Sequence, residues 1–416
     1  MVRDLGQPGP SQTWGNILRP NPRILGVTAR CSPIYDDRVG PDRSARLRSE
    51  VADLARQGLH WVSFASEASD LIKKVVPFDR CCWHTIDPGT VLLTGSVNRD
   101  VTCSGSWLAE HEYVIEDVNK WWFLARSGRH AGATSLATHG DMSRSARHRS
   151  HAGYGIGDEL RGSFVADGNY WGAAGFLRDS GQPWFTDDDV RLLASLSGAI
   201  ASGLRNALAT KVAVTEVVAA ADGPGVVVLD EFGQAEFISP AAEHLIAQLV
   251  EEPAPNTPAQ SPIVQAVAAR VRTLTAGSDP LQLAARSRVQ TRSGSWLLLY
   301  GTPLAGGDPG RTAVILQPAA AGDVAPLVAL AYGLTDRERQ VVRLCIEGRS
   351  TKEMAAALHV SPYTIQDHLK SIFDKTGVRT RNELVGQVFL EHYAPRWEDV
   401  HDAPAGWTAK AAPQTI

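Results

Sequence analysis

Cysteine is scarce in this sequence, and its positions follow no known binding pattern. Five cysteines occur in 416 residues without any Cys-x-x-Cys spacing, namely Cys31, Cys81, Cys82, Cys103 and Cys345. An odd number of scattered cysteines argues against a disulfide framework and against a zinc ribbon. We therefore expect a protein of a reducing compartment, and the sequence predicts no metal site and no bound cofactor.

Long apolar runs and an excess of positive charge are also missing. The longest weakly polar stretch, residues 192–204, is too short to cross a bilayer and contains serines. The N-terminus lacks the basic segment and apolar run of a secretory signal. Lys and Arg number 41 against 45 Asp and Glu, a formal net charge of -4. We expect a soluble cytoplasmic protein without membrane contact, in which any nucleic-acid contact is confined to a local surface.

Length and composition predict several folded domains. Hydrophobic residues make up 44% and charged residues 21%, and a chain of 416 residues is long enough for two to four domains. No internal sequence repeat is evident. The predicted fold class is multidomain α+β, with two α/β regions before an all-α module of four helices. The predicted divisions are a disordered arm (1–40), a first α/β region with leading helices (41–210), a second α/β region (211–320), a linker of small residues (321–333), the helical module (334–394) and a C-terminal tail (395–416).

The first α/β region is predicted from strand and helix patterns. Residues 81–86 and 170–177 have the composition of strands, and Thr186 caps a helix whose first turn carries three aspartates. Apolar residues recur every three or four positions along that helix, at Leu193, Leu196, Ile200, Leu204 and Leu208. This stripe either packs against its own sheet or forms a dimer interface, and the sequence leaves both interpretations open.

The second α/β region shows a similar succession of elements. Residues 225–230 predict a buried strand, and Ser239-Pro240 opens a helix. A stretch rich in proline and polar residues, 251–262, predicts a loop before a helix over 262–275. Three antiparallel strands are expected after it, at 289–292, 295–302 and 312–316.

Capping patterns divide the C-terminal module into short helices. Two of its helices begin with a capping box, formed by Thr335 with Glu338 and by Ser350 with Glu353. Ser361-Pro362 places a cap before a proline at the first helical position, and Gly377 ends that third helix. Thr380 caps a fourth. Two short helices joined by a tight turn are typical of a helix-turn-helix arrangement.

The third helix of this module has one apolar and one polar face. At 100° per residue, Ile365, Leu369 and Ile372 lie together on the side expected to face the core. The outward face and its flanks carry polar side chains, namely Tyr363, Thr364, Gln366, Asp367, Lys370, Ser371 and Asp374. A DNA major groove admits one such helix and presents distinct donor and acceptor patterns to its side chains.

The C-terminal module resembles the LuxR-type helix-turn-helix of bacterial transcription regulators. The resemblance covers about 55 of the 416 residues and depends on spaced elements in a fixed order. These elements are Leu-Thr-x-Arg-Glu at 334–338, Gly348-x-Ser350-x-Lys352-Glu353, Ser361-x-x-Thr364-Ile365-x-x-His368-Leu369 and Lys375-x-Gly377-Val378. The resemblance implies a four-helix module that binds double-stranded DNA as a homodimer, with its last helix forming the dimer contact.

The resemblance also implies which residues contact DNA. By position these are Lys352, Ser361, Thr364, Gln366, His368 and Lys370, and the outward face of the third helix adds Tyr363. The family usually has lysine where this chain has Gln366. Glutamine can bond adenine in bidentate fashion but neutralises no phosphate. Because residues 330–393 hold nine Lys and Arg against eight Asp and Glu, we expect modest non-specific affinity and specificity from a few contacts and from dimerisation.

The two upstream regions resemble sensor modules. Residues 60–210 resemble a GAF domain in their strands and in Phe185-Thr186-x-x-Asp189, and residues 214–318 resemble a PAS-type domain. Such folds hold a small molecule between sheet and helices, or simply dimerise. The whole is interpreted as a transcription regulator without catalytic residues, associated with the nucleoid. Its expected partners are DNA, a second copy of the chain, a candidate small-molecule effector and candidate RNA polymerase.

Two alternatives remain open. Cys81, Cys82 or Cys103 of the GAF-like region could serve a thiol redox sensor or enzyme; strand alternation sends Cys81 and Cys82 to opposite faces of the sheet. The chain could instead be an interaction protein that binds another regulator without contacting DNA. Six histidines between residues 84 and 151 lack zinc-ligand spacing. Arg144, Arg147 and Arg149 around one of them predict a solvated or anion-attracting loop.

Overall fold

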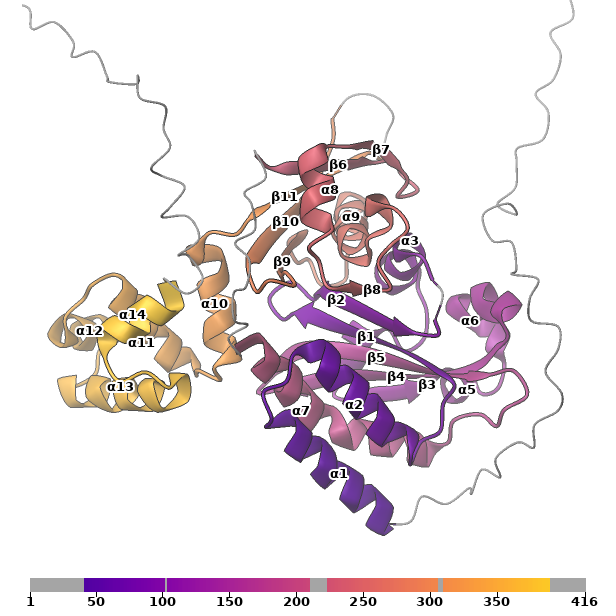
Figure 1. The fold of residues 1–416 in the computed structure, drawn as a ribbon, viewed down its shortest axis with the longest axis horizontal. Coiled ribbons are helices and arrows are strands. Elements are labelled where there is room, and N and C mark those ends of the chain that lie inside the picture. Colours follow the sequence, from indigo (N-terminus) through magenta and orange to yellow (C-terminus); the bar gives the residue numbers. More distant parts are fainter. Residues whose placement is uncertain (1–40, 102, 210–222, 306–309, 390–416) are drawn as a thin grey trace, which may run out of the picture. The chain divides into compact units, whose positions relative to one another are not determined.

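The computed structural model describes residues 41–101, 103–209, 223–305 and 310–389 (Figure 1). The predicted arm 1–40 and the predicted tail 395–416 lie outside the described residues. Within the described ranges, no helix is both long enough and apolar enough to cross a membrane.

The first α/β region is built on an antiparallel sheet with helices on both faces (Figure 1). Its own strands are β1 (Arg80–Asp87), β2 (Leu92–Arg99), β3 (Ala131–Ala133), β4 (Ile156–Ala166) and β5 (Asn169–Asp179), in the order β3-β4-β5-β1-β2. Its helical elements are α1 (Pro41–Ala55), α2 (Trp61–Lys73), α3 (Gly105–Ala109), η1 (Glu110–Val114), α4 (Trp121–Arg126), α5 (Thr134–Ala137), η2 (Met142–Arg144), α6 (Ala146–His151), η3 (Ala152–Tyr154) and α7 (Asp187–Ala209).

The second α/β region repeats this strand order. Its strands are β6 (Gly225–Leu229), β7 (Ala235–Ile238), β9 (Arg286–Gln290), β10 (Trp296–Pro303) and β11 (Thr312–Pro318), in the order β9-β10-β11-β6-β7. Its helical elements are α8 (Pro240–Ile246), η4 (Pro258–Gln260) and α9 (Pro262–Thr275). When the strands of each region are numbered along the chain, both sheets read 3-4-5-1-2. The two regions share this strand order but no pattern of residues, so the sequence shows no internal repeat.

The apolar stripe of α7 lies in the core of the first region. Leu193, Leu196, Ile200 and Leu204 are each at most 1% exposed and pack in one cluster with side chains of α1, α2 and the sheet. Of the two interpretations that the sequence left open, packing within the chain is the one confirmed, because these side chains are already covered.

Two segments contain regular structure that the sequence does not predict. The predicted linker 321–333 contains helix α10 (Ala321–Ala331). Small residues suggested a linker, but alanine is the strongest helix former, and Val324, Leu327 and Val328 give this helix a buried face. Likewise, the predicted loop 251–262 contains β8 (Glu251–Glu252), which pairs with β2 in parallel and extends the first sheet. A strand of two residues is too short to show alternation.

The C-terminal module consists of α11 (Asp336–Ile346), α12 (Thr351–Leu358), α13 (Pro362–Thr376) and α14 (Arg381–Phe389). The capping boxes of Thr335 and Ser350 are present as predicted. Ser361 caps α13, which ends at Gly377 in the left-handed conformation. The turn between α12 and α13 passes through His359 at a φ of 54°. The fold class predicted from the sequence is thus confirmed: sheet-containing α/β regions precede an all-helical module.

Candidate nucleic-acid interface

Helix α13 is held by an apolar face buried in the core of the helical module. Ile365 and Ile372 are fully buried, and Leu369 is half-buried against the same cluster. Met354 and Ala355 of α12 belong to this cluster, together with Val341 and Cys345 of α11. This packing fixes the rotation of α13 about its axis, so the opposite face is presented to solvent, as the helical wheel predicts.

A buried carboxylate fastens α13 to α11. Glu338 is 3% exposed, and its two carboxylate oxygens accept hydrogen bonds from Lys375 Nζ at 2.9 and 2.7 Å. Ser371 Oγ donates to the same carboxylate at 2.7 Å. Burial opposes the ionised form, but hydrogen bonds from Lys375, Ser371 and Thr335 prevail and lower the pKa of Glu338 to about 2. Lys375 is therefore engaged inside the module.

The predicted DNA-facing residues lie on the solvent side of α12 and α13. Tyr363 is 72% exposed, Thr364 and His368 are half-buried, and the side chains of the remaining four are exposed: Lys352, Ser361, Gln366 and Lys370. Two of the set have partners within α13. Ser361 Oγ accepts a hydrogen bond from the Thr364 backbone N–H at 3.0 Å and lies 2.8 Å from Thr364 Oγ1. Ser361 and Thr364 therefore cap the N-terminus of α13.

The comparisons with known proteins match this same segment. The profile of bacterial regulatory proteins of the luxR family matches residues 333–387. The spore germination protein GerE of Bacillus subtilis is 38% identical over 52 residues, which cover 12% of this chain and 70% of that protein. The chain belongs to the luxR family. Its C-terminal module is the family's helix-turn-helix DNA-binding domain.

Other relatives match the luxR-family chain over a segment of similar length. A Mycobacterium bovis protein named as an HTH-type transcriptional regulator is 48% identical over 54 residues, covering 13% of this chain but only 6% of its own length. The monoamine regulon transcriptional regulator of Klebsiella aerogenes is 42% identical over 57 residues, 14% of this chain and 25% of that protein. Escherichia coli SdiA has 10% identity over 84% of this chain and 98% of its own, with a TM-score of 0.27. A TM-score this low carries no structural argument.

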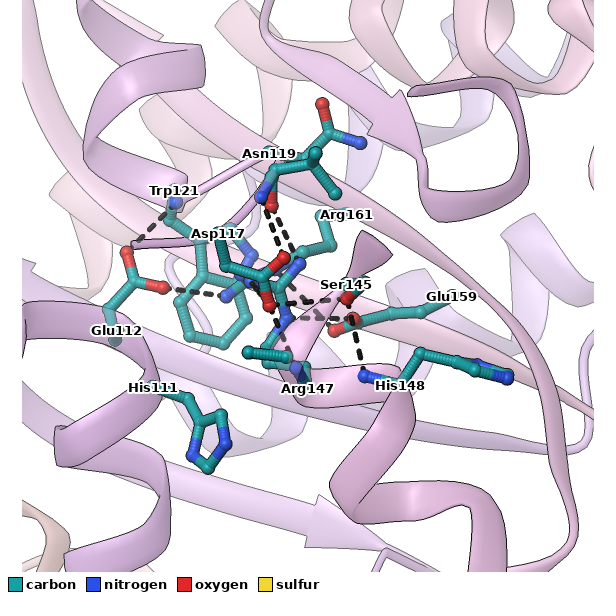
Figure 2. Close-up of polar contacts among 12 residues, drawn as sticks. His111, Glu112, Asp117, Asn119, Trp121, Ser145, Arg147, His148, Glu159 and Arg161 are labelled. Atoms are coloured by element: carbon teal, nitrogen blue, oxygen red, sulfur yellow. Dashed lines mark hydrogen bonds and ion pairs between the residues drawn. The ribbon is translucent and has the colours of Figure 1, made fainter. Parts of the chain in front are cut away.

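A second polar cluster lies inside the first α/β region (Figure 2). Arg147 of α6 is 3% exposed; its Nη1 lies 3.2 Å from Asp117 and its Nε 3.1 Å from Glu159. Its Nη2 donates to the Val118 carbonyl at 2.8 Å. The prediction of a solvated, anion-attracting loop is therefore wrong for this arginine. Sequence reasoning missed the pairing because both carboxylates are distant in the sequence.

The cluster continues to β4 (Figure 2). Arg161 is 1% exposed and pairs with Glu112 at 2.8 Å, and its guanidinium carbon lies 3.7 Å from the centroid of the Trp121 ring. Three carboxylates and two guanidiniums are thus paired with one another across α6, β4 and the η1–α4 segment. The arrangement fastens these elements together. Among the described residues, no group of three His, Cys, Asp or Glu side chains is placed to hold a metal ion.

Cys81 and Cys82 are buried on opposite sides of the sheet of the first region, whereas Cys103 is half-buried. Cys81 packs in the α2–α7 core and Cys82 in the core on the other face, which confirms the predicted alternation. Burial raises the pKa of the Cys81 and Cys82 thiols, and it raises the pKa of Cys103 to about 12. Reactive cysteines need a lowered pKa and access, so the structure gives no support to the thiol-chemistry alternative.

Proposed function

We propose that this chain is a transcriptional regulator that binds a specific operator through α13. The observation that supports this most is the exposed polar face of that helix. Within the described part of the chain, Gln366 and Lys370 make no hydrogen bond or ion pair. Gln366 can pair with adenine in the major groove, and Lys370 can neutralise a phosphate. Tyr363, at the start of the helix, and Lys352 of α12 border the same face.

The operator we propose is an inverted repeat read by a homodimer. The module is nearly neutral, so a single copy gains little affinity from phosphate contacts alone. Two copies on half-sites about one helical turn apart gain affinity without any new contact in either copy. RNA polymerase is a candidate further partner of the DNA-bound protein.

We further propose that the two α/β regions control DNA binding, by a small-molecule effector or a domain contact. Helix α10 supports this, because it contributes to two cores. Val324, Leu327 and Val328 pack in the core of the first region, and Ala329 packs in the core of the DNA-binding domain. A change of packing in the α/β regions would therefore reach the domain through a helix with two buried faces.

The experiment that tests the proposal is selection of genomic fragments by the purified full-length chain at one stated salt concentration. We expect recovery of an inverted-repeat motif, and its loss in the variant Lys370→Ala. Lys74→Ala is the matched control, because Lys74 is exposed and lies just after α2, outside the DNA-binding domain. Its replacement changes the net charge by the same amount as Lys370→Ala. Recovery of the same motif with Lys370→Ala and Gln366→Ala combined would contradict the assignment of α13.

A further inference from the structure

A cavity lies on the α2 side of the first sheet. It is a groove of about 230 Å³ between α2 and the β1–β2 strands, and Glu252 of β8 lines it as well. A single water needs only about 15 Å³ measured in this way, so the groove accepts a small organic molecule. From its chemistry we infer that it binds a small zwitterion of amino-acid size with an apolar side chain. This inference rests on the proposed function, because it names the class of effector.

The floor of the groove is apolar. Its hydroxyl group, Ser69 Oγ, accepts a hydrogen bond from Trp83 Nε1 at 2.8 Å and donates to the Ala65 carbonyl at 2.7 Å. The Cys81 sulfur lies 3.7 Å from the same oxygen. Since the polar atoms of Ser69 and Trp83 already have partners, a ligand on this floor meets the indole of Trp83 and the methyl group of Ala65. A polar group placed there would lose hydrogen bonds to water without replacement, so the apolar part of the ligand belongs on the floor. Asn98, whose buried Oδ1 accepts no hydrogen bond from the described residues, also lines the groove.

The rim of the groove carries one charge of each sign. Arg99 of β2 pairs with Asp70 at 2.8 Å and donates a hydrogen bond to Ser66 Oγ at 2.7 Å. Glu252 pairs with Arg292 at 3.4 Å. All four charged side chains are between 39% and 62% exposed. Exposed pairs of this kind contribute little and exchange readily. A ligand carboxylate can therefore bind Arg99 while a ligand ammonium binds Glu252.

The two charges come from different α/β regions of the chain. Arg99 and Val97 lie on β2, and Glu252 lies opposite Val97 on the neighbouring strand β8, which follows α8 in the sequence. A ligand that bridges Arg99 and Glu252 therefore fastens β8 to β2. This favours the conformation in which the second region completes the first sheet, and a ligand shifts an equilibrium by its preference for one state.

Isothermal titration calorimetry on the full-length chain tests the inference. The probes are L-leucine, 3-methylbutylamine, which lacks the carboxylate, and 4-methylpentanoate, which lacks the amine. We expect L-leucine to bind, and each analogue to bind at least tenfold more weakly because one charge pair is lost. An analogue that binds as well as L-leucine overturns the zwitterion, and failure of all three probes to bind overturns the site.

Variants locate the binding. Arg99→Met is expected to weaken L-leucine binding at least tenfold, whereas Arg56→Met, an exposed arginine at the end of α1, leaves it unchanged. Val62→Trp fills the groove from α2 and is expected to abolish binding with the melting temperature retained. Undiminished binding in both Arg99→Met and Val62→Trp overturns the location. The same preparations are assayed for operator binding, so a chain that binds DNA but not L-leucine contradicts this inference and leaves the proposed function standing.

Discussion

A few buried charged side chains determine how the DNA-binding helix is presented. Glu338 caps α11 and at the same time accepts hydrogen bonds from Ser371 and Lys375 of α13. Its partners lie on two helices, so its ionised form is stabilised only in the folded domain. The capping role was readable from the sequence, because it depends on residues three apart. The contacts with α13 were not, because they depend on tertiary packing.

We predict that the DNA-binding domain loses stability in acid through Glu338. Its folded pKa of about 2 lies below the ordinary value of 4.5. The stabilisation is therefore fully present above pH 4.5 and is lost as the pH falls toward 2. It amounts to about 3–4 kcal/mol at most, at about 1.4 kcal/mol per pKa unit. Hydrogen exchange of α11 and α13 amides in the full-length chain should show this dependence, and Glu338→Gln should flatten it. An unchanged dependence in that variant would contradict the prediction.

A second residue-scale prediction concerns Arg147. Arg147→Met leaves Asp117 and Glu159 without this buried partner, which typically costs about 3–5 kcal/mol. We expect a large fall in the midpoint of urea unfolding followed by a probe in the first region. Arg144→Met serves as the control, because Arg144 lies in the same segment but is exposed. Equal effects of the two substitutions would show that Arg147 is not part of a buried ion cluster.

The thiols provide a third prediction. Because burial raises the pKa of Cys81, Cys82 and Cys103, we expect iodoacetamide to leave all three unmodified in the native chain at pH 8 and to modify them after denaturation. Mass spectrometry of the peptides measures this directly. Rapid modification of any one of them by iodoacetamide in the native chain would support the thiol-chemistry alternative.

At the scale of elements, local patterns predicted the structure wherever a helix carries its own signals. The helices α11, α12 and α13 begin and end at capping residues that lie within the same few positions of sequence. By contrast, the small residues of α10 predict only a linker, because the buried face of this helix depends on contacts with α7 and with the DNA-binding domain. The sequence does not predict strand β8, because its partner strand β2 is far away along the chain: Ser96 and Glu251, which lie opposite each other, are 155 residues apart. Contacts between segments far apart in the chain produce no periodic residue pattern within either segment.

Helix α10 carries a prediction of its own. Leu327 is 1% exposed, so Leu327→Ala removes buried apolar volume, at a cost of about 2–5 kcal/mol. We expect faster hydrogen exchange in α10 and in the end of α7. Pro326 is exposed inside the same helix and lacks an N–H donor. Pro326→Ala should therefore slow exchange in α10. Changes of opposite sign in the hydrogen-exchange rate of α10 in the two variants would identify the segment as a packed helix. Exchange rates equal to each other in both variants would indicate a linker without packing.

At the scale of the molecule, the chain combines two α/β regions of the same strand order with one DNA-binding domain. The luxR-family segment could be recognised from sequence because its motif residues are close together. The zwitterion groove could not, because its residues come from α2, the β1–β2 strands and β8. We therefore propose that α13 recognises the operator and that the packing around α10 and β8 controls DNA binding.

The measurement that tests the central claim most directly is operator affinity as a function of salt concentration, for the wild-type chain and three variants. Lys370→Ala should weaken binding to all sequences and reduce the salt slope by about 1, because one phosphate contact is lost. Gln366→Ala should keep the slope but lose about 1–3 kcal/mol of discrimination at one base pair. Lys74→Ala should behave as wild type. If Lys370→Ala and Gln366→Ala also match the wild type in affinity, slope and discrimination, α13 does not read the operator.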